Sequence, residues 1–439
     1  MTISESGSDL GERGHERAGG AERGEAAPAS ERREGVRRDE GPRPNLDWRR
    51  NQAAVTTATF MGFAGFTLVM PFLPLYFGQL GVKDTSAVAV WSGVCLGVTP
   101  AITAAMAPVW ARLADRFGRK MMVARSLFSF FVIMALMAFV TAPWHVLVLR
   151  IIQGFFAGYG PIALTMAAES APPDEVATAI GWVQTAQRLG PALGPVIGGA
   201  LAQALGLRRS FIVSAGVYLA AFALVLAAYR EKAGPRVPVV AGRPAGTTFA
   251  ELRRYPHFLL FMATVFGLQL VDRSLGPILP LYLEEIGFDS ARVPFLAGIL
   301  FTTTACAGAA GNQAARFLLA RVPAGSLVPG MMAVSMAGTV LFSLAGPWMS
   351  LLAVAAGFGF ALGVATTSIY TSASQTVPIA ARGAAFAYLS SAYLVALAVS
   401  PVVAGFLGAA SMRSVFVADA AGLAVLAWIV RREMSHAAN

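Results

Sequence analysis

The sequence has little charge and few of the residues that build catalytic or metal sites. Only 13% of its 439 residues are charged, and it contains two cysteines, four histidines and three lysines. Cys95 and Cys306 lie inside apolar runs, so neither a disulfide framework nor a CxxC metal site is possible. The histidines are scattered and lack metal-ligand spacing. We therefore expect no metal and no cofactor.

Common enzyme motifs are missing as well. No lysine follows a glycine, which excludes the phosphate-binding GxxxxGK[ST] loop. The GxSxG and HExxH patterns of hydrolases and metalloproteases do not occur either. The sequence thus predicts a protein that is not an enzyme.

What the sequence has in abundance is apolar residues. They make up 56% of the chain, and the mean hydropathy is +0.61. A soluble domain is about 45–50% apolar by a count that includes glycine, and a membrane span needs roughly 20 apolar residues. The pattern predicts an all-α membrane protein with twelve transmembrane helices. We place them near 53–79, 87–110, 121–140, 144–168, 176–204, 209–229, 257–282, 293–314, 325–345, 347–373, 384–408 and 412–431.

Two polar stretches divide the chain. Residues 1–48 are rich in Gly, Arg and Glu and show no periodicity, which predicts a disordered cytoplasmic tail. Residues 230–256 are rich in Pro, Gly and Arg and separate the sixth span from the seventh. We expect this linker to join an N-terminal bundle, 49–229, to a C-terminal bundle, 257–432. The end of the linker, 249–254, has the pattern of a short interfacial helix.

The net charge of +10 follows the loops rather than one surface. Residues 1–50 hold 10 basic and 11 acidic side chains, so the excess lies in the apolar part. If the N-terminus is cytoplasmic, the inside loops hold 16 basic residues and the outside loops 5. This bias predicts that both termini face the cytoplasm. It favours the lipid bilayer, and not nucleic acid, as the partner.

An internal repeat relates the two halves. The sequence PFLPLY at 71–76 recurs as PILPLY at 277–282, and Gly194-Pro195 recurs as Ser400-Pro401. Further along, 208–211 matches 413–416. Two six-helix bundles related by a parallel repeat are one architecture of secondary transporters.

The segment ARLADRFGRK at 111–120 is expected to form the loop between spans two and three. Gly118 would allow a tight turn. The segment resembles the signature loop of the major facilitator superfamily, except that Ala111 replaces a glycine. No similar motif with an acid occurs around 311–325.

The resemblance implies a conformational role for this loop, which in that family is thought to latch the two bundles in the outward-facing state. Asp115 would meet the N-terminus of a helix in the second bundle, where the helix dipole favours an anion. Arg119 would pair with an acid near the end of span four, and Glu169 is the candidate. The alternative is an ordinary basic cytoplasmic loop.

The fourth span carries a charge in LRIIQGFFAG, 149–158. Arg150 and Gln153 are three residues apart and share a helix face. A charge inside a span is costly and should face a cavity or a partner. The R-x-x-Q-G spacing resembles a second facilitator motif associated with proton-coupled members. The alternative is an arginine that reaches the membrane surface from the end of the span.

The fifth span contains a stripe of small residues. Gly190, Gly194 and Gly198 recur every four residues, and Pro195 lies among them. Such a stripe allows close helix packing, and the proline bends the helix. The run from Gly190 to Gly199 resembles the antiporter motif of the drug:proton antiporters. A packing face common to any transporter is the alternative.

Polar residues lie on the other side of this span. Gln184 and Arg188 are one turn apart and point away from the glycines, at about 100° per residue. We expect them to face water, in a substrate or coupling role or in a structural ion pair.

Span seven has the best candidate for a carboxylate within the membrane. Gln269, Asp272 and Arg273 form one polar sector. Direct pairing of Asp272 with Arg273 is not expected, because adjacent helical residues point about 100° apart. Asp272 is a candidate proton carrier, with local charge neutralisation as the alternative and Asp419 in span twelve as a second candidate.

The resemblance covers residues 49 to about 432 and is strongest to the twelve-span drug:proton antiporters. It implies a monomeric exporter in the inner membrane that exchanges small molecules for protons by alternating access. One alternative is a facilitator for a defined anionic or sugar-like metabolite, which the intramembrane arginines favour. A second is a membrane scaffold that does not transport.

Overall fold

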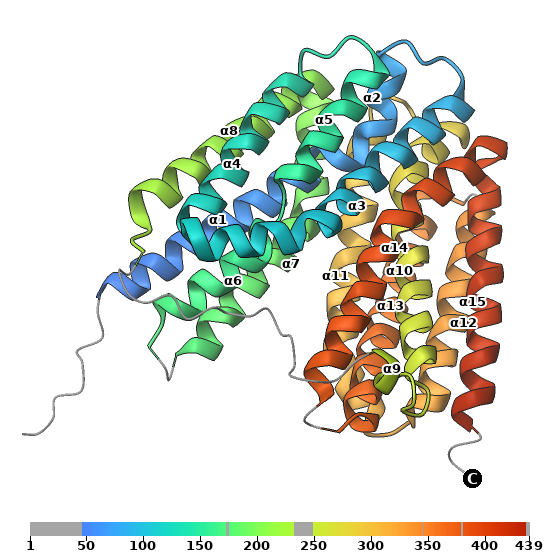
Figure 1. Cartoon of the computed structure of the whole chain (residues 1–439). Helices are drawn as coiled ribbons and strands as arrows, with labels where there is room; N and C mark the ends of the chain where they lie inside the picture. The colour runs from blue at the N-terminus through green and yellow to red at the C-terminus, as the bar shows by residue number, and fades with distance from the viewer. Residues whose placement is uncertain (1–45, 173–174, 232–248, 345, 379–380, 436–439) are drawn as a thin grey trace, which may run out of the picture. The chain divides into compact units, whose positions relative to one another are not determined.

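The computed structural model describes residues 46–172, 175–231, 249–344, 346–378 and 381–435, and every regular element in these ranges is a helix (Figure 1). Helices satisfy their own backbone hydrogen bonds, which a membrane interior requires. Within the described ranges, eleven segments are long and apolar enough to cross a membrane. The twelfth span is α7 (Val176–Leu205), whose glycines, prolines and Arg188 lower its apolar character.

The helices form two bundles of six spans. The first bundle contains α1 (Leu46–Val69), η1 (Met70–Phe72), α2 (Leu73–Gln79), α3 (Thr85–Phe117), α4 (Arg119–Met137), α5 (Pro143–Phe156), α6 (Tyr159–Ser170), α7 and α8 (Leu207–Ala228). The short α9 (Phe249–Leu252) precedes the second bundle, which contains α10 (Phe258–Glu285), α11 (Val293–Leu319), α12 (Ala324–Ser343), α13 (Trp348–Thr376), α14 (Arg382–Ala410) and α15 (Met412–Ser435). The predicted all-α, twelve-span fold is confirmed.

Two spans consist of more than one helix. The first is made of α1, η1 and α2, and Pro71 and Pro74 lie in the first turns of η1 and α2. The repeat-related Pro277 and Pro280 lie inside the continuous helix α10. The fourth is made of α5 and α6, which meet at Gly158 with a φ of +111°. A left-handed backbone of this kind suits glycine alone among common residues.

The expected loop at 111–120 is almost entirely helical. The helix α3 runs to Phe117 and α4 begins at Arg119, so the connection is the single residue Gly118. Its φ of +99° makes this sharp turn possible. At its other end, α3 is capped by Asp84, whose carboxylate accepts hydrogen bonds from the backbone N–H groups of Ser86 and Ala87.

Most of the expected tail and part of the linker lie outside the described residues. Of the tail, 1–48, only 46–48 are described, and they begin α1 rather than ending an irregular segment. Of the linker, 230–256, residues 232–248 are not described. The short α9 lies where an interfacial helix is expected, with Phe249 exposed and Leu252 buried.

The internal repeat is visible in matching hydrogen bonds. The Tyr76 hydroxyl donates to the carbonyl of Met137, and the Tyr282 hydroxyl donates to the carbonyl of Phe342, each at 2.6 Å. The two tyrosines end the repeated PxLPLY segments, and both are fully buried. The repeat in sequence therefore reflects one helix arrangement used twice.

The bundles touch through glycines at repeat-related positions. Gly93 of α3 lies against the carbonyl oxygen of Pro401 in α14, and Gly298 of α11 lies against that of Pro195 in α7. The two prolines are the ones the sequence repeat relates. A Cβ atom on either glycine would overlap the facing carbonyl oxygen, so only glycine allows this approach.

A second pair of contacts completes the arrangement. Gly199 of α7 lies against the carbonyl of Pro294, and Gly405 of α14 lies against that of Ala89. All four contacts lie in the half of the molecule where α2 ends and α3 begins, which we call the Lys83 end. The opposite end, where α3 turns into α4, is the Gly118 end. The bundles are thus held together toward the Lys83 end.

Candidate functional site

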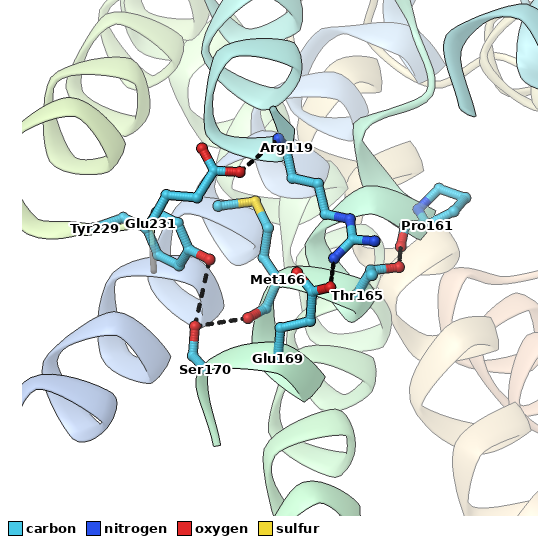
Figure 2. A network of polar contacts seen from close by, with 8 residues as sticks. All are labelled: Arg119, Pro161, Thr165, Met166, Glu169, Ser170, Tyr229 and Glu231. Atoms are coloured by element: carbon cyan, nitrogen blue, oxygen red, sulfur yellow. Dashed lines mark hydrogen bonds and ion pairs between the residues drawn. The ribbon is translucent and has the colours of Figure 1, made fainter. Parts of the chain in front are cut away.

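A polar network surrounds the turn at the Gly118 end (Figure 2). The Arg119 guanidinium forms an ion pair with Glu169 at the end of α6. The Arg119 backbone N–H donates to the Glu231 carboxylate at 3.0 Å. The expected partner of Arg119 is therefore the one present, and the pair lies within the first bundle. The side chain of Asp115 lies outside the described residues.

The same network ties α6 to the end of α8. The Ser170 hydroxyl lies 3.3 Å from the Tyr229 hydroxyl and donates to the carbonyl of Met166 at 2.7 Å (Figure 2). Burial raises the pKa of the Tyr229 phenol, which lies just beyond α8, so it stays neutral. The network fixes three helix ends around the turn at Gly118.

Arg125 is a functional candidate that no motif in the sequence identified. It lies within α4, and its guanidinium is 3.4 Å from the ring centroid of Trp110. It also donates to the carbonyl of Phe156 at 3.2 Å, where α5 ends. An arginine stacked on an indole is a cation–π arrangement. Its position two turns into an apolar segment was the available signal.

Arg150 is fully buried in the first bundle, with 1% of its surface exposed. It donates to the Gln153 side-chain oxygen at 2.5 Å, and its guanidinium also contacts the sulfur of Met70. The ring of Phe66 lies 5.9 Å away. Arg150 and Gln153 therefore act together, as their shared helix face predicts, and they contact span one.

The polar atoms of this pair are incompletely satisfied. Among the described residues, Arg150 has no carboxylate partner, and neither its Nε nor the Gln153 amide nitrogen has a hydrogen-bond acceptor. Buried polar groups usually have partners. A buried cation with free donors can attract an anionic or hydrogen-bond-accepting group.

The glycine stripe of α7 packs against α1 of the same bundle. Gly190 faces Phe63 and Ala64, and Gly194 faces Thr67. Gly198 faces the carbonyl of Leu68. The Thr67 hydroxyl lies 3.3 Å from the carbonyl of Gly190. The next residue, Gly199, faces the second bundle instead. The run that resembles the antiporter motif thus contacts both bundles.

The polar face of α7 is exposed. Gln184 and Arg188 are both exposed, whereas the neighbouring Gln187 is half-buried and donates to the carbonyl of Gly160 at 3.0 Å. The expectation that Gln184 and Arg188 point away from the glycine stripe agrees with this exposure.

The expectation about Asp272 and Arg273 was wrong. Their side chains form an ion pair, with 3.1 Å between the Arg273 Nε and the Asp272 carboxylate. Adjacent Cβ atoms diverge on a helix, but the long arginine side chain folds back to its neighbour. Both are partly exposed, and Gln269 is half-buried one turn earlier. The charges on this sector of α10 therefore balance each other.

Behind this sector, α10 also contacts a second carboxyl group. Asp419 of α15 is 4% exposed, and its carboxyl oxygen lies 2.5 Å from the hydroxyl of Ser274. The serine is 2% exposed. The sequence offered Asp419 as a weaker candidate, but it did not predict this contact between residues 145 positions apart.

A cavity of about 1040 Å³ opens at the Lys83 end. Lys83, Glu284 and Glu285 are among its lining residues. It is separate from Arg150, Arg188 and Asp272, none of which lines it. We therefore treat the intramembrane residues, and not this cavity, as the candidate site.

Two repeated six-helix bundles with charged residues inside the spans define the class of secondary transporters. The sequence matches the Major Facilitator Superfamily over residues 55–347. This is two thirds of the chain, and the protein belongs to that family.

Among its relatives are the multidrug resistance proteins MdtG of Escherichia coli. The protein of strain K12 / DH10B is 35% identical over 257 residues, which cover 58% of this chain and 62% of that protein. The protein of strain O81 (ED1a) is 35% identical over 259 residues, covering 58% of this chain and 63% of that protein. The chain thus matches less than two thirds of the length of these curated relatives.

Solved structures share the fold. A bacterial homologue of the human lysosomal transporter Spinster, in an inward-facing and unoccupied conformation, has a TM-score of 0.73 and 15% identity, covering 89% of this chain and 98% of that chain. A single-residue mutant of the nucleoside transporter NupG has a TM-score of 0.66 and 14% identity, covering 87% of this chain and 99% of that chain.

Proposed function

We propose that the protein exports small drug-like or amphipathic molecules by proton-coupled alternating access. Its family membership and its likeness to the multidrug resistance proteins support this activity. The observation that carries the proposal is the double contact of α7. Its glycine stripe lies on α1, and Gly199 lies on α11 of the other bundle. A helix packed in this way transmits a movement of one bundle to the other.

The moving parts are the bundles at 49–229 and 257–432, joined by the linker at 230–256. With the Lys83 end outside, the four glycine contacts close the outer side, and the exporter loads substrate from the Gly118 end. The gating residues are those of the Gly118 turn and the α7 stripe: Asp115, Gly118, Arg119, Glu169, Gly190, Gly194, Pro195 and Gly198.

Substrate and protons act on the polar residues within the spans. In the first bundle these residues are Arg150 and Gln153, together with Gln184 and Arg188 on the exposed face of α7. Gln269, Asp272 and Arg273 serve the second bundle. One elementary charge moving through 100 mV is worth about 2.3 kcal/mol. This supports a substrate gradient of roughly 40-fold, enough for efflux without ATP.

We propose that the protein is a monomer in the inner (cytoplasmic) membrane, with both termini in the cytoplasm. The loop charge bias and the bacterial relatives support this topology. Its partners are the substrate, protons and lipid.

One alternative has a specific observation in its favour. Arg150 is a buried cation without a carboxylate partner among the described residues, and Arg188 is exposed. Both suit a facilitator for an anionic metabolite. The remaining alternative, a scaffold that does not transport, has no such support.

The test uses the purified chain in liposomes with an acidic interior. Ethidium, chloramphenicol and carboxyfluorescein serve as cationic, neutral and anionic probes, and protein-free liposomes measure passive entry. The proposal predicts accumulation of at least one probe, collapsed by a protonophore. Equilibration of carboxyfluorescein without accumulation would support the facilitator instead, and no protein-dependent flux of any probe would support the scaffold.

A further inference from the structure

The structure contains a buried carboxyl group outside the polar sector of α10. Asp419 lies in the third turn of α15, about 10 Å from the start of the helix at 1.5 Å per residue. It is 4% exposed, and it faces Ser274, which is 2% exposed. The site is therefore dry and lies within a membrane span.

No cation balances Asp419 in the described part of the chain. The elements packed against α15 are α10, α12 and α14. Along α12, Ala324–Ser343, there is no titratable side chain. The arginine closest in sequence to Ser274 is Arg273, which is paired with Asp272. The remaining titratable or charged groups of these elements lie toward helix ends or on α14: Tyr282, Glu284, Glu285, Arg382, Tyr388, Tyr393, Arg413, Arg431, Arg432 and Glu433.

The hydrogen-bond geometry around Ser274 favours a protonated Asp419. The Ser274 oxygen lies 2.5 Å from the Asp419 carboxyl and 2.8 Å from the carbonyl of Val271. A hydroxyl has one hydrogen and cannot donate to both. Both contacts are hydrogen bonds when Asp419 carries a proton and donates to Ser274, while Ser274 donates to Val271.

The first bundle joins the equivalent pair of helices without a carboxyl group. The repeat that relates 208–211 to 413–416 places Ser214 at the position equivalent to Asp419. Ser214 donates directly to the carbonyl of Gly65 at 2.7 Å. Gly65 is equivalent to Val271 by the repeat that relates 71–76 to 277–282. A serine therefore suffices to join the helices, and the carboxyl group adds only the ability to bind a proton.

We propose that Asp419 and Ser274 form a proton-binding site between α10 and α15. Asp419 is protonated in the conformation described and loses its proton when water reaches this contact. The acid O–H bond then breaks, the proton goes to water, and the carboxylate keeps the electron pair. The Ser274 hydroxyl turns from Val271 to the carboxylate. Because Ser274 is two residues from Asp272, the proton state of Asp419 acts on the same stretch of α10 that carries the polar sector.

The proton-binding step can be tested without transport. Infrared difference spectra of the purified full chain, recorded over a pH titration, detect the carbonyl stretch of a buried carboxylic acid. We expect this band in the wild type and its loss in Asp419→Asn. We expect a shift in Ser274→Ala, and no change in the matched control Ser214→Ala. A band that persists in Asp419→Asn, or no such band in the wild type at any pH, would overturn the proposal.

The link to transport rests on the proposed function and is measured separately. In proteoliposomes, Asp419→Asn is expected to keep exchange of labelled for unlabelled probe and to lose accumulation driven by a pH gradient. Asp419→Ser introduces the residue found at the equivalent position of the first bundle, Ser214. We expect it to keep exchange and to lose gradient-driven accumulation, as Asp419→Asn does, and it controls for a folding defect of the asparagine variant. Gradient-driven accumulation at the wild-type level in both variants would overturn the inference. A wild type that never accumulates a probe but has the infrared band would instead refute only the proposed function.

Discussion

Gly93 lies directly against the carbonyl oxygen of Pro401, and this contact joins α3 of one bundle to α14 of the other. Its counterpart is the contact of Gly298 with Pro195. Because a Cβ atom does not fit at either glycine, the two contacts depend on the absence of a side chain. They make the closure at the Lys83 end sensitive to single substitutions.

Gly93→Val is expected to open the Lys83 end. The added side chain collides with the Pro401 carbonyl, at a cost of about 1–3 kcal/mol, which shifts the conformational balance by about 5-fold to 100-fold. A cysteine introduced at Ala202, which lines the cavity at this end and is only 6% exposed, should react faster with a membrane-impermeant maleimide. Gly216→Val is the control, because a Cβ there meets no atom. Equal labelling rates in the two variants would contradict the closure.

The ion pair of Arg119 and Glu169 is expected to stabilise the Gly118 end modestly. Glu169 is 39% exposed, so solvent screens the pair and the coupling should be roughly 1 kcal/mol. A double-mutant cycle with Arg119→Gln and Glu169→Gln, followed by thermal unfolding, measures this term. The exposed pair Asp289 and Arg292, 3.9 Å apart, is the control and should give almost no coupling. A coupling energy no larger than that of the control pair would show that the Arg119–Glu169 ion pair does not stabilise the Gly118 end.

Removing one of the two charges in the Asp272–Arg273 ion pair should lower the thermal stability more than removing both. Asp272→Asn leaves Arg273 as an unbalanced charge, and insertion scales put that cost at about 2.5–3.5 kcal/mol at the centre of a span. Each single variant should therefore lose thermal stability, and the double variant with Arg273→Gln should recover most of it. Purely additive losses would mean that the 3.1 Å pair contributes nothing.

Arg150 is expected to lower the thermal stability of the protein and to be required for transport. A fully buried guanidinium without a carboxylate partner is unfavourable, so Arg150→Met should raise the thermal unfolding temperature. The same variant should lose transport, because the free donors of Arg150 and Gln153 are proposed to meet the substrate. Ser92→Ala, which changes a buried polar residue of α3 outside this pair, is the control for packing. A lower unfolding temperature with intact transport would refute this role.

The sequence predicted the fold well because its signals are local. Each apolar run is long enough to span a membrane, and the turn expected at Gly118 has the positive φ that glycine allows. The break of span four at Gly158 was not predicted. The repeat of PxLPLY also marked Tyr76 and Tyr282, whose hydrogen bonds are the same in both bundles.

The parts that were missed depend on side-chain reach and on contacts between distant residues. Helical projection placed Asp272 and Arg273 apart, but it ignores the length of an arginine side chain. Arg125 belongs to no motif in the sequence, yet it stacks on Trp110. The partner of Asp419 is 145 residues away, which no local pattern identifies.

The most direct measurement of the central claim is proton release on substrate binding. Ethidium, chloramphenicol and carboxyfluorescein are added in turn to the detergent-solubilised wild type in weak buffer, and a pH-sensitive dye records the change. We expect the probe that binds to cause proton release from the wild type, and we expect Asp419→Asn to bind the same probe without release. Binding to the wild type with no proton release at any pH would contradict proton-coupled export.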